Sequence, residues 1–237
     1  MGRERKTVIA GTGRCGTTCL IQILTRAGLD TGLHEVSAGV WRTPVPRGWI
    51  KLDPQTGRVV SMQREKADKR NTFVKQANAG CEILLAPSDD PEFVRTNIPE
   101  VIKDPRLAWC GHELIDQGIL QIRHLILCVR NLKDVATSKK ERAKHDTGSW
   151  YQHSFDKVYD VSAWQLGVCL SEMVTRDIPL SFLSFPRFVH DEDYFLTTIQ
   201  NVFPDHAPDL FRYAWQATAN RTLVHHNRGS DKIGEGP

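Results

Sequence analysis

Apolar residues occur along this chain in two patterns, short runs typical of buried strands and longer stretches with the spacing of helices. The short runs lie at residues 7–10, 100–103, 122–129 and 180–185. Helical spacing occurs at residues 16–27, 109–117, 155–176 and 191–202. A further helix is predicted up to Lys144, because Asn131 can serve as its N-terminal cap.

Two stretches between the first predicted helix and the second predicted strand show neither a short apolar run nor the spacing of a buried helix. Residues 30–58 are rich in glycine and proline and predict mostly loop. Residues 61–79 carry many polar and charged side chains and predict an exposed helix. We therefore expect the regular, buried part of the chain to resume only at about residue 100.

The alternation of strands and helices predicts a parallel sheet with helices on both faces, which is a three-layer α/β fold. The length of 237 residues suits a single domain over residues 1–237. The polar, glycine-rich residues 227–237 are expected to form a mobile tail. Because ligands of such folds bind at the carboxyl ends of the strands, a site is expected in the segments that follow the predicted strands.

Composition narrows the classes of function. The net charge of +3 is too small to predict nucleic-acid binding. No apolar run reaches the roughly 18 residues that a membrane helix needs. The charged N-terminus lacks the features of a secretory signal, so a cytoplasmic protein is expected. The six cysteines form no CxxC pair, which favours reduced thiols and indicates no metal site.

A glycine-rich loop between the first strand and the first helix is the strongest functional signal. It reads Gly11-Thr12-Gly13-Arg14-Cys15-Gly16-Thr17-Thr18. Glycines let the backbone turn sharply and direct its N–H groups to one point, and the helix N-terminus adds partial positive charge. The loop therefore predicts a site for a phosphate-like anion.

Three interpretations of the loop compete. Its glycines fit the GxGxxG spacing of dinucleotide-binding proteins, but the segment before Glu35 is a poor second strand. They also fit the frame of a Walker A loop, although Thr17 stands where that motif has its lysine. In the third interpretation Arg14 grips two anionic oxygens at once, which suits a phosphosulfate.

A second motif follows the longest predicted strand. Arg130 ends that strand, and Ser138 follows eight positions later on the next helix, so that a guanidinium and a hydroxyl can reach one phosphate. Together the loop and this pair resemble the two nucleotide-binding motifs of the PAPS-dependent sulfotransferase family, where PAPS is 3′-phosphoadenosine-5′-phosphosulfate. Residues 102–107 and 185–191 resemble two further family segments more loosely.

The resemblance carries several expectations. It implies the P-loop-like sulfotransferase fold, PAPS as co-substrate and adenosine 3′,5′-bisphosphate (PAP) as product, with no metal. The loop would bind the 5′-phosphosulfate, with Arg14 stabilising the leaving phosphate. Arg130 and Ser138 would bind the 3′-phosphate. Because Arg14 replaces the usual lysine and no histidine follows Lys103, the resemblance is to the bacterial or protein-tyrosine type of branch rather than to the cytosolic one.

A sulfotransferase also needs a base to accept the proton of the acceptor. The candidates, in order of preference, are Glu35, Asp104, His34 and His112. Residues 33–97, with Trp41, Trp49 and Phe73, are expected to line the acceptor pocket. The acceptor itself stays open among a small molecule, a saccharide, a lipid and a peptide.

The alternative functions are a small P-loop kinase or NTPase, a non-catalytic adenine-nucleotide-binding protein, and a dehydrogenase. Thr17 and the lack of a clear metal-binding acid after a strand disfavour the kinase. The dehydrogenase rests on the GxGxxG spacing alone.

Overall fold

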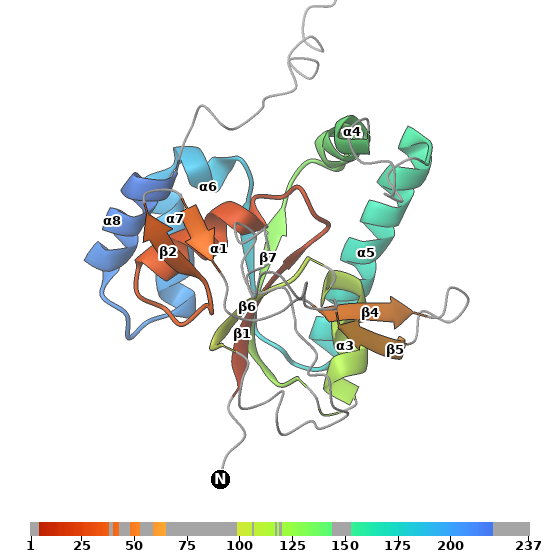
Figure 1. Ribbon diagram of the computed structural model, residues 1–237, viewed down its shortest axis with the longest axis horizontal. Helices are drawn as coiled ribbons and strands as arrows, with labels where there is room; N and C mark the ends of the chain where they lie inside the picture. The colour runs from red at the N-terminus through yellow and green to blue at the C-terminus, as the bar shows by residue number, and fades with distance from the viewer. Residues whose placement is uncertain are drawn as a thin grey trace, which may run out of the picture.

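A computed structural model describes residues 5–37, 40–42, 48–52, 59–64, 99–105, 107–116, 118, 120–143 and 153–219. A sheet lies at its centre (Figure 1). The strand order of this sheet is β6-β1-β7-β8. The strands span Val101–Lys103, Lys6–Gly11, Ile122–Val129 and Leu180–Ser184, respectively. Each neighbouring pair is parallel, so the predicted parallel α/β sheet is confirmed.

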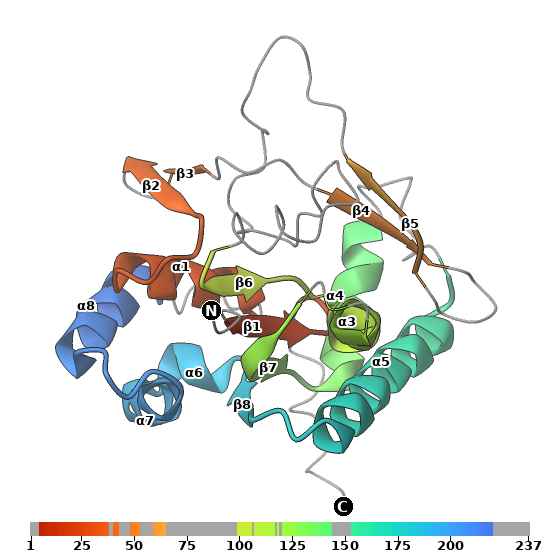
Figure 2. The same ribbon diagram turned by 90° about the horizontal axis from the view of Figure 1, so that it is seen from below.

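Helices cover both faces of this sheet (Figure 2). One face packs against α1 and the C-terminal helices α6, α7 and α8, which span Thr17–Arg26, Arg187–His190, Glu192–Val202 and Pro208–Thr218. The other face packs against α3 and α5, which span Leu107–Asp116 and Phe155–Thr175. Helix α4, Leu132–Ala143, begins just after the end of β7 and packs on α5.

Alternation along β1 explains why two cores form. Ile9 is buried against α1 and the C-terminal helices, whereas Val8 and Ala10 are buried on the side of α3 and α5. Successive side chains of a strand point to opposite faces, so a continuous apolar run requires cover on both sides. The runs of β1 and β7 are therefore central strands, whereas β6 and β8 form the edges of the sheet and Phe182 of β8 is exposed.

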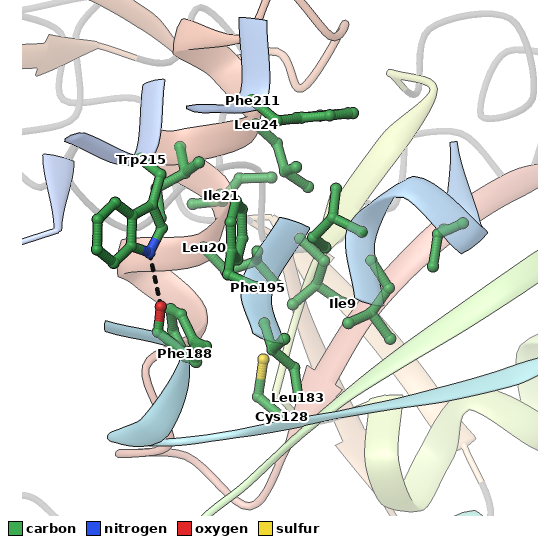
Figure 3. Packing of buried hydrophobic residues seen from close by; sticks show 14 of the residues in the cluster. Ile9, Leu20, Ile21, Leu24, Cys128, Leu183, Phe188, Phe195, Phe211 and Trp215 are labelled. Atoms are coloured by element: carbon green, nitrogen blue, oxygen red, sulfur yellow. Dashed lines mark hydrogen bonds between the residues drawn. The ribbon is translucent and has the colours of Figure 1, made fainter. Parts of the chain in front are cut away.

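The core on the α1 side is closed by aromatic residues of the last helices (Figure 3). Phe188, Phe195 and Phe211 have no exposed surface. The indole Nε1 of Trp215 donates a hydrogen bond of 2.6 Å to the carbonyl of Phe188 and so ties α8 to α6. This packing holds α1, and with it the end of the glycine-rich loop, against the sheet.

Most predicted elements are confirmed within a few residues. The predicted cap is confirmed too, because the Oδ1 of Asn131 accepts a hydrogen bond of 2.9 Å from the Lys133 N–H at the start of α4. The predicted helix over residues 61–79 is wrong at its start, because β5, Val59–Arg64, is a strand. Val59 and Val60 are β-branched residues that favour a strand. Residues 65–79 lie outside the described residues, as do Phe73 and the expected tail at 227–237.

The predicted loop over residues 30–58 holds three further strands. They are β2, β3 and β4, which span His34–Ser37, Val40–Arg42 and Gly48–Leu52. β2 pairs with β3 and β4 pairs with β5, each antiparallel and outside the main sheet. Helix α8 was not predicted from the pattern, although Pro208 at its first position is a common helix start.

Candidate anion-binding site

The glycine-rich loop lies at the carboxyl end of β1 and leads directly into α1. Gly13, Arg14 and Gly16 have φ values of 78°, 61° and 80°, so three residues of the turn adopt the left-handed conformation. Glycine adopts it without cost, whereas arginine does so only where the surroundings impose it. The first N–H groups of α1 have no partner within the helix, which makes this turn suited to an anion.

Close packing also explains two of the glycines. A Cβ at Gly11 would lie 2.7 Å from the Cys128 carbonyl oxygen on β7, so a side chain there would separate the two strands. A Cβ at Gly16 would overlap the Phe185 ring and lie 3.0 Å from that of Phe188. The loop is therefore held tightly between β7 and the segment that follows β8.

Side-chain contacts stabilise the turn from within. The Thr12 hydroxyl lies 3.2 Å from the Cys15 thiol, which in turn donates to the Gly13 carbonyl at 3.1 Å. Cys15 is buried, and burial raises the pKa of its thiol. The Thr12 hydrogen bonds and the charges of Lys139 and Arg130 lower that pKa in part. Cys15 is thus a structural thiol that lies close to two cations.

Arg130 extends from the end of β7 to the loop. One of its Nη atoms donates to the Arg14 carbonyl at 3.4 Å, and its Nε lies 3.8 Å from a carboxylate oxygen of Asp134. The guanidinium also lies over the Phe185 ring, 5.3 Å from the ring centroid. Since 9% of the side chain is exposed, this cation is held in a fixed position beside the loop.

Ser138 lies on α4, two turns into the helix, on the side that faces the loop. The Nε of Arg14 donates to its hydroxyl oxygen at 3.1 Å. The structure therefore brings the glycine-rich loop to Arg130 and Ser138, although more than a hundred residues separate the loop from those two residues in the sequence. Only the strand order, with β7 next to β1, makes this possible.

Two buried lysines accompany the site, and the sequence reasoning gave neither a role. Lys139 has no exposed surface and donates from Nζ to the Ser162 hydroxyl at 3.0 Å. Burial lowers the pKa of Lys139 to about 8, an effect that the nearby Cys15 opposes. Lys103, at the end of β6, is also buried. The sequence carried one sign that Lys139 faces the interior. It lies four residues after Val135, and therefore on the same face of a helix that is otherwise mostly polar.

Asp104 follows β6 and lies close to the loop. Its backbone N–H donates to the Ile9 carbonyl at 3.0 Å, which continues the β6–β1 pairing toward Gly11. Its side chain is buried, with 1% of the residue exposed. Of the preferred base candidates, Asp104 is the one that the structure holds next to the loop.

Glu35 and His34 lie elsewhere. Both Glu35 carboxylate oxygens accept hydrogen bonds from the guanidinium of Arg26, the last residue of α1. Helix α1 spans ten residues, about 15 Å, from its N-terminus in the loop to that end. Asp30, before this hairpin, is bonded to the N–H groups of Glu100 and Val101 at the amino end of β6. The preference for Glu35 as the base is therefore not supported by its position, and neighbouring His34 shares that position.

The remaining base candidate, His112, lies on α3, and no hydrogen bond or ion pair of the described residues joins it to the loop. His112 is half-buried, with its Nε2 3.5 Å from a carboxylate oxygen of Glu113.

Within the described residues, no group of three or more histidine, cysteine or acidic side chains is arranged to hold a metal ion. No described helix has both the length and the apolar character to cross a membrane.

Comparisons with known proteins add no relative. No family model, no curated protein and no solved structure matches this chain. The function must therefore be argued from the site itself.

Proposed function

We propose that this protein is a PAPS-dependent sulfotransferase that transfers a sulfuryl group to a hydroxyl or amine of an acceptor. The observation that supports the proposal is the contact between the two motifs. Arg14 of the loop is 3.1 Å from Ser138, and Arg130 is 3.4 Å from the Arg14 carbonyl. A nucleotide with phosphates at both its 5′ and 3′ positions needs two adjacent anion sites of this kind.

The described residues suggest a division of roles. The loop and the N-terminus of α1 would hold the 5′-phosphosulfate, and Arg130 with Ser138 would hold the 3′-phosphate. During transfer the S–O bond to the phosphate breaks, and the electron pair leaves with PAP. The acceptor oxygen or nitrogen forms the new bond to sulfur, and its proton passes to Asp104. Loop N–H groups would stabilise the charge that grows on the leaving phosphate.

Calorimetric titration with PAP, 5′-AMP, ATP–Mg²⁺ and NAD tests the proposal. Tight binding of PAP without metal, in preference to the other three, is the expected result. Arg130→Ala should weaken PAP about 10- to 100-fold and leave 5′-AMP nearly unchanged, since a charged hydrogen bond to the 3′-phosphate is lost. Preference for ATP–Mg²⁺ or NAD would overturn the proposal.

The base is tested separately, by single-turnover transfer from PAPS to a panel of hydroxyl and amine acceptors. Asp104→Asn should slow transfer about 10²- to 10⁴-fold, the usual contribution of a general base. Glu35→Gln is the matched control, because its carboxylate is engaged with Arg26 at the far end of α1. A loss with Glu35→Gln and not with Asp104→Asn would reverse this assignment.

One observation favours the kinase alternative. Asp104 is a buried acid at the end of β6, the strand beside β1, and an acid near a phosphate loop is the group that P-loop enzymes use for magnesium. Phosphoryl transfer from ATP that depends on Mg²⁺ and is abolished by Asp104→Asn would establish this function instead.

A further inference from the structure

Lys139 is a buried cation to which the proposed function assigns no role. It follows Ser138 on α4, but it has no exposed surface. Its Nζ donates a hydrogen bond of 3.0 Å to the Ser162 hydroxyl on α5. Ser162 in turn donates to the Val158 carbonyl at 2.7 Å, so its hydroxyl is satisfied as acceptor and as donor. The ammonium group is therefore fixed between α4 and α5.

The same ammonium group lies close to the glycine-rich loop. Its charge lowers the pKa of the Cys15 thiol, as the charge of Arg130 does. That thiol is buried and donates to the Gly13 carbonyl, so this side of the loop faces the interior. Two residues after Cys15, Thr17 begins α1. Lys139 thus lies behind the turn that is suited to an anion.

We infer that Lys139 supplies buried positive charge to the anion site from behind the loop, and so couples nucleotide binding to the uptake of a proton. This inference rests on the proposed function, which assigns the 5′-phosphosulfate to the loop. Because Lys139 has no exposed surface, a ligand in the loop does not contact it. Charges nevertheless interact more strongly in the interior than in water. An anion in the loop favours the protonated lysine, and the protonated lysine favours the anion by the same factor.

The groups that face Lys139 do not exchange protons near pH 8 as it does. Burial lowers the pKa of Lys139 to about 8, so roughly half of the free protein carries its proton at pH 8. Burial raises the pKa of the Cys15 thiol above 9.0, which keeps that thiol protonated. Arg130 keeps its charge and is paired with Asp134 of α4, and Ser162 of α5 does not titrate. A phosphate, with a second pKa of about 6, is already a dianion at pH 8.

Calorimetric titration at pH 8, in two buffers with different enthalpies of ionisation, counts the protons taken up when PAP or 5′-AMP binds. If the anion favours the protonated lysine about tenfold, the wild type takes up about 0.4 proton. Its affinity for either nucleotide then falls about fivefold from pH 7 to pH 9. The sign follows because, above pH 8, the anion must bind to a protein whose lysine has lost its charge.

Two variants on α4 assign the proton to Lys139. Lys139→Met removes the charge, so it should bind both nucleotides about tenfold more weakly at pH 7 but only about twofold more weakly at pH 9. Its uptake at pH 8 should be smaller by the same 0.4 proton, or about that. Lys140→Met is the matched control. Lys140 is the next residue, its Nζ donates to the His153 carbonyl, and its replacement should leave the uptake and the pH dependence as in the wild type.

NMR of the protein with ¹³C-labelled lysine gives the same test without a variant. A lysine that titrates near pH 8 in the free protein should titrate at a pH about one unit higher with 5′-AMP bound. A resonance that titrates identically in both states would overturn the inference, as would equal proton uptake by the wild type and Lys139→Met. Either result leaves the proposed function standing if PAP is still preferred.

Failure of the proposed function gives a different result. A wild type that prefers ATP–Mg²⁺ would overturn that function, and the proton count with ATP–Mg²⁺ would then decide the role of Lys139. A protein that binds none of these nucleotides would overturn both.

Discussion

Lys139 is a charged side chain with no exposed surface on a helix that is otherwise mostly polar. It donates to Ser162 on α5 and lies near Cys15 behind the loop. Burial lowers the pKa of this lysine from 10.5 to about 8. A cation in this position strengthens the attraction of the loop for an anion, and its burial makes it costly for the fold.

The pH dependence of stability should reveal this lysine. Between pH 8 and pH 10.5 the unfolded chain keeps the proton that the folded chain has released, so the unfolded state binds more protons and stability rises with pH. The free energy of unfolding of the wild type, minus that of Lys139→Met, should rise by about 1 kcal/mol from pH 8 to pH 9. Denaturant titration at each pH measures this difference. The Lys139→Met variant is the reference because all other titrating groups contribute equally to both proteins. Parallel profiles would show that Lys139 titrates near its ordinary pKa.

Gly16 offers a second test at the same scale, with a matched control in Gly28. Both have positive φ values, 80° and 92°, but a Cβ meets the rings of Phe185 and Phe188 at Gly16 and nothing within 4 Å at Gly28. Gly28→Ala should cost about 1–2 kcal/mol of stability from backbone strain. Gly16→Ala should cost about 1–3 kcal/mol more, because the aromatic rings must move. Equal losses in thermal unfolding would mean that the rings are free to yield.

At the level of elements, helix α8 supports the site from a distance. It packs on α1, the helix whose N-terminus completes the loop, and Trp215 links it to α6 through the bond to the Phe188 carbonyl. The same end of α8 holds Arg26, whose guanidinium donates to the Ala217 carbonyl at 2.6 Å. The position of α1, and so the geometry of the loop, depends on a helix that the apolar pattern did not reveal.

The contribution of α8 can be measured at Trp215. Trp215→Phe keeps most of the apolar surface and removes the indole N–H, which should cost about 1–3 kcal/mol for the carbonyl that loses its donor. Tyr213→Phe on the same helix is 69% exposed and should stay within about 0.5 kcal/mol of the wild type. Chemical unfolding of the two variants distinguishes them. If both match the wild type, the bond between α8 and α6 contributes nothing to stability.

At the level of the whole molecule, the site joins segments from the two halves of the chain. The loop follows β1, and its partners Arg130 and Ser138 follow β7. A ligand that bridges them binds only the folded state, so it stabilises the entire domain rather than one loop.

This linkage predicts a thermal shift. PAP at a hundred times its dissociation constant should stabilise the protein by about 2.7 kcal/mol. For a domain of this size that corresponds to an increase in Tm of about 5–10 °C. The shift should persist in EDTA and shrink in Arg130→Ala at the same PAP concentration. An equal shift with ATP–Mg²⁺ that EDTA abolishes would favour the kinase alternative.

The sequence by itself determined the parallel α/β class and the glycine-rich loop after β1. It also determined the extents of the strands of the main sheet and of most helices that cover it. These depend on local periodicity, on glycine at tight turns and on the burial of apolar runs, all of which can be read over a few residues. The spacing of Arg130 and Ser138 can also be read locally, because both residues belong to one strand–helix unit.

Only the tertiary structure decided which residues meet. It brought Arg14 to Ser138, placed Asp104 beside the loop, and held Glu35 at the far end of α1 through Arg26. It also buried Lys139 and added α8 to the core. Such contacts follow from the order of strands in the sheet and from the directions in which side chains leave the backbone. Local patterns of polar and apolar residues carry neither kind of information. The preferred base candidate therefore changed from Glu35 to Asp104, whereas the glycine-rich loop remained the candidate anion site.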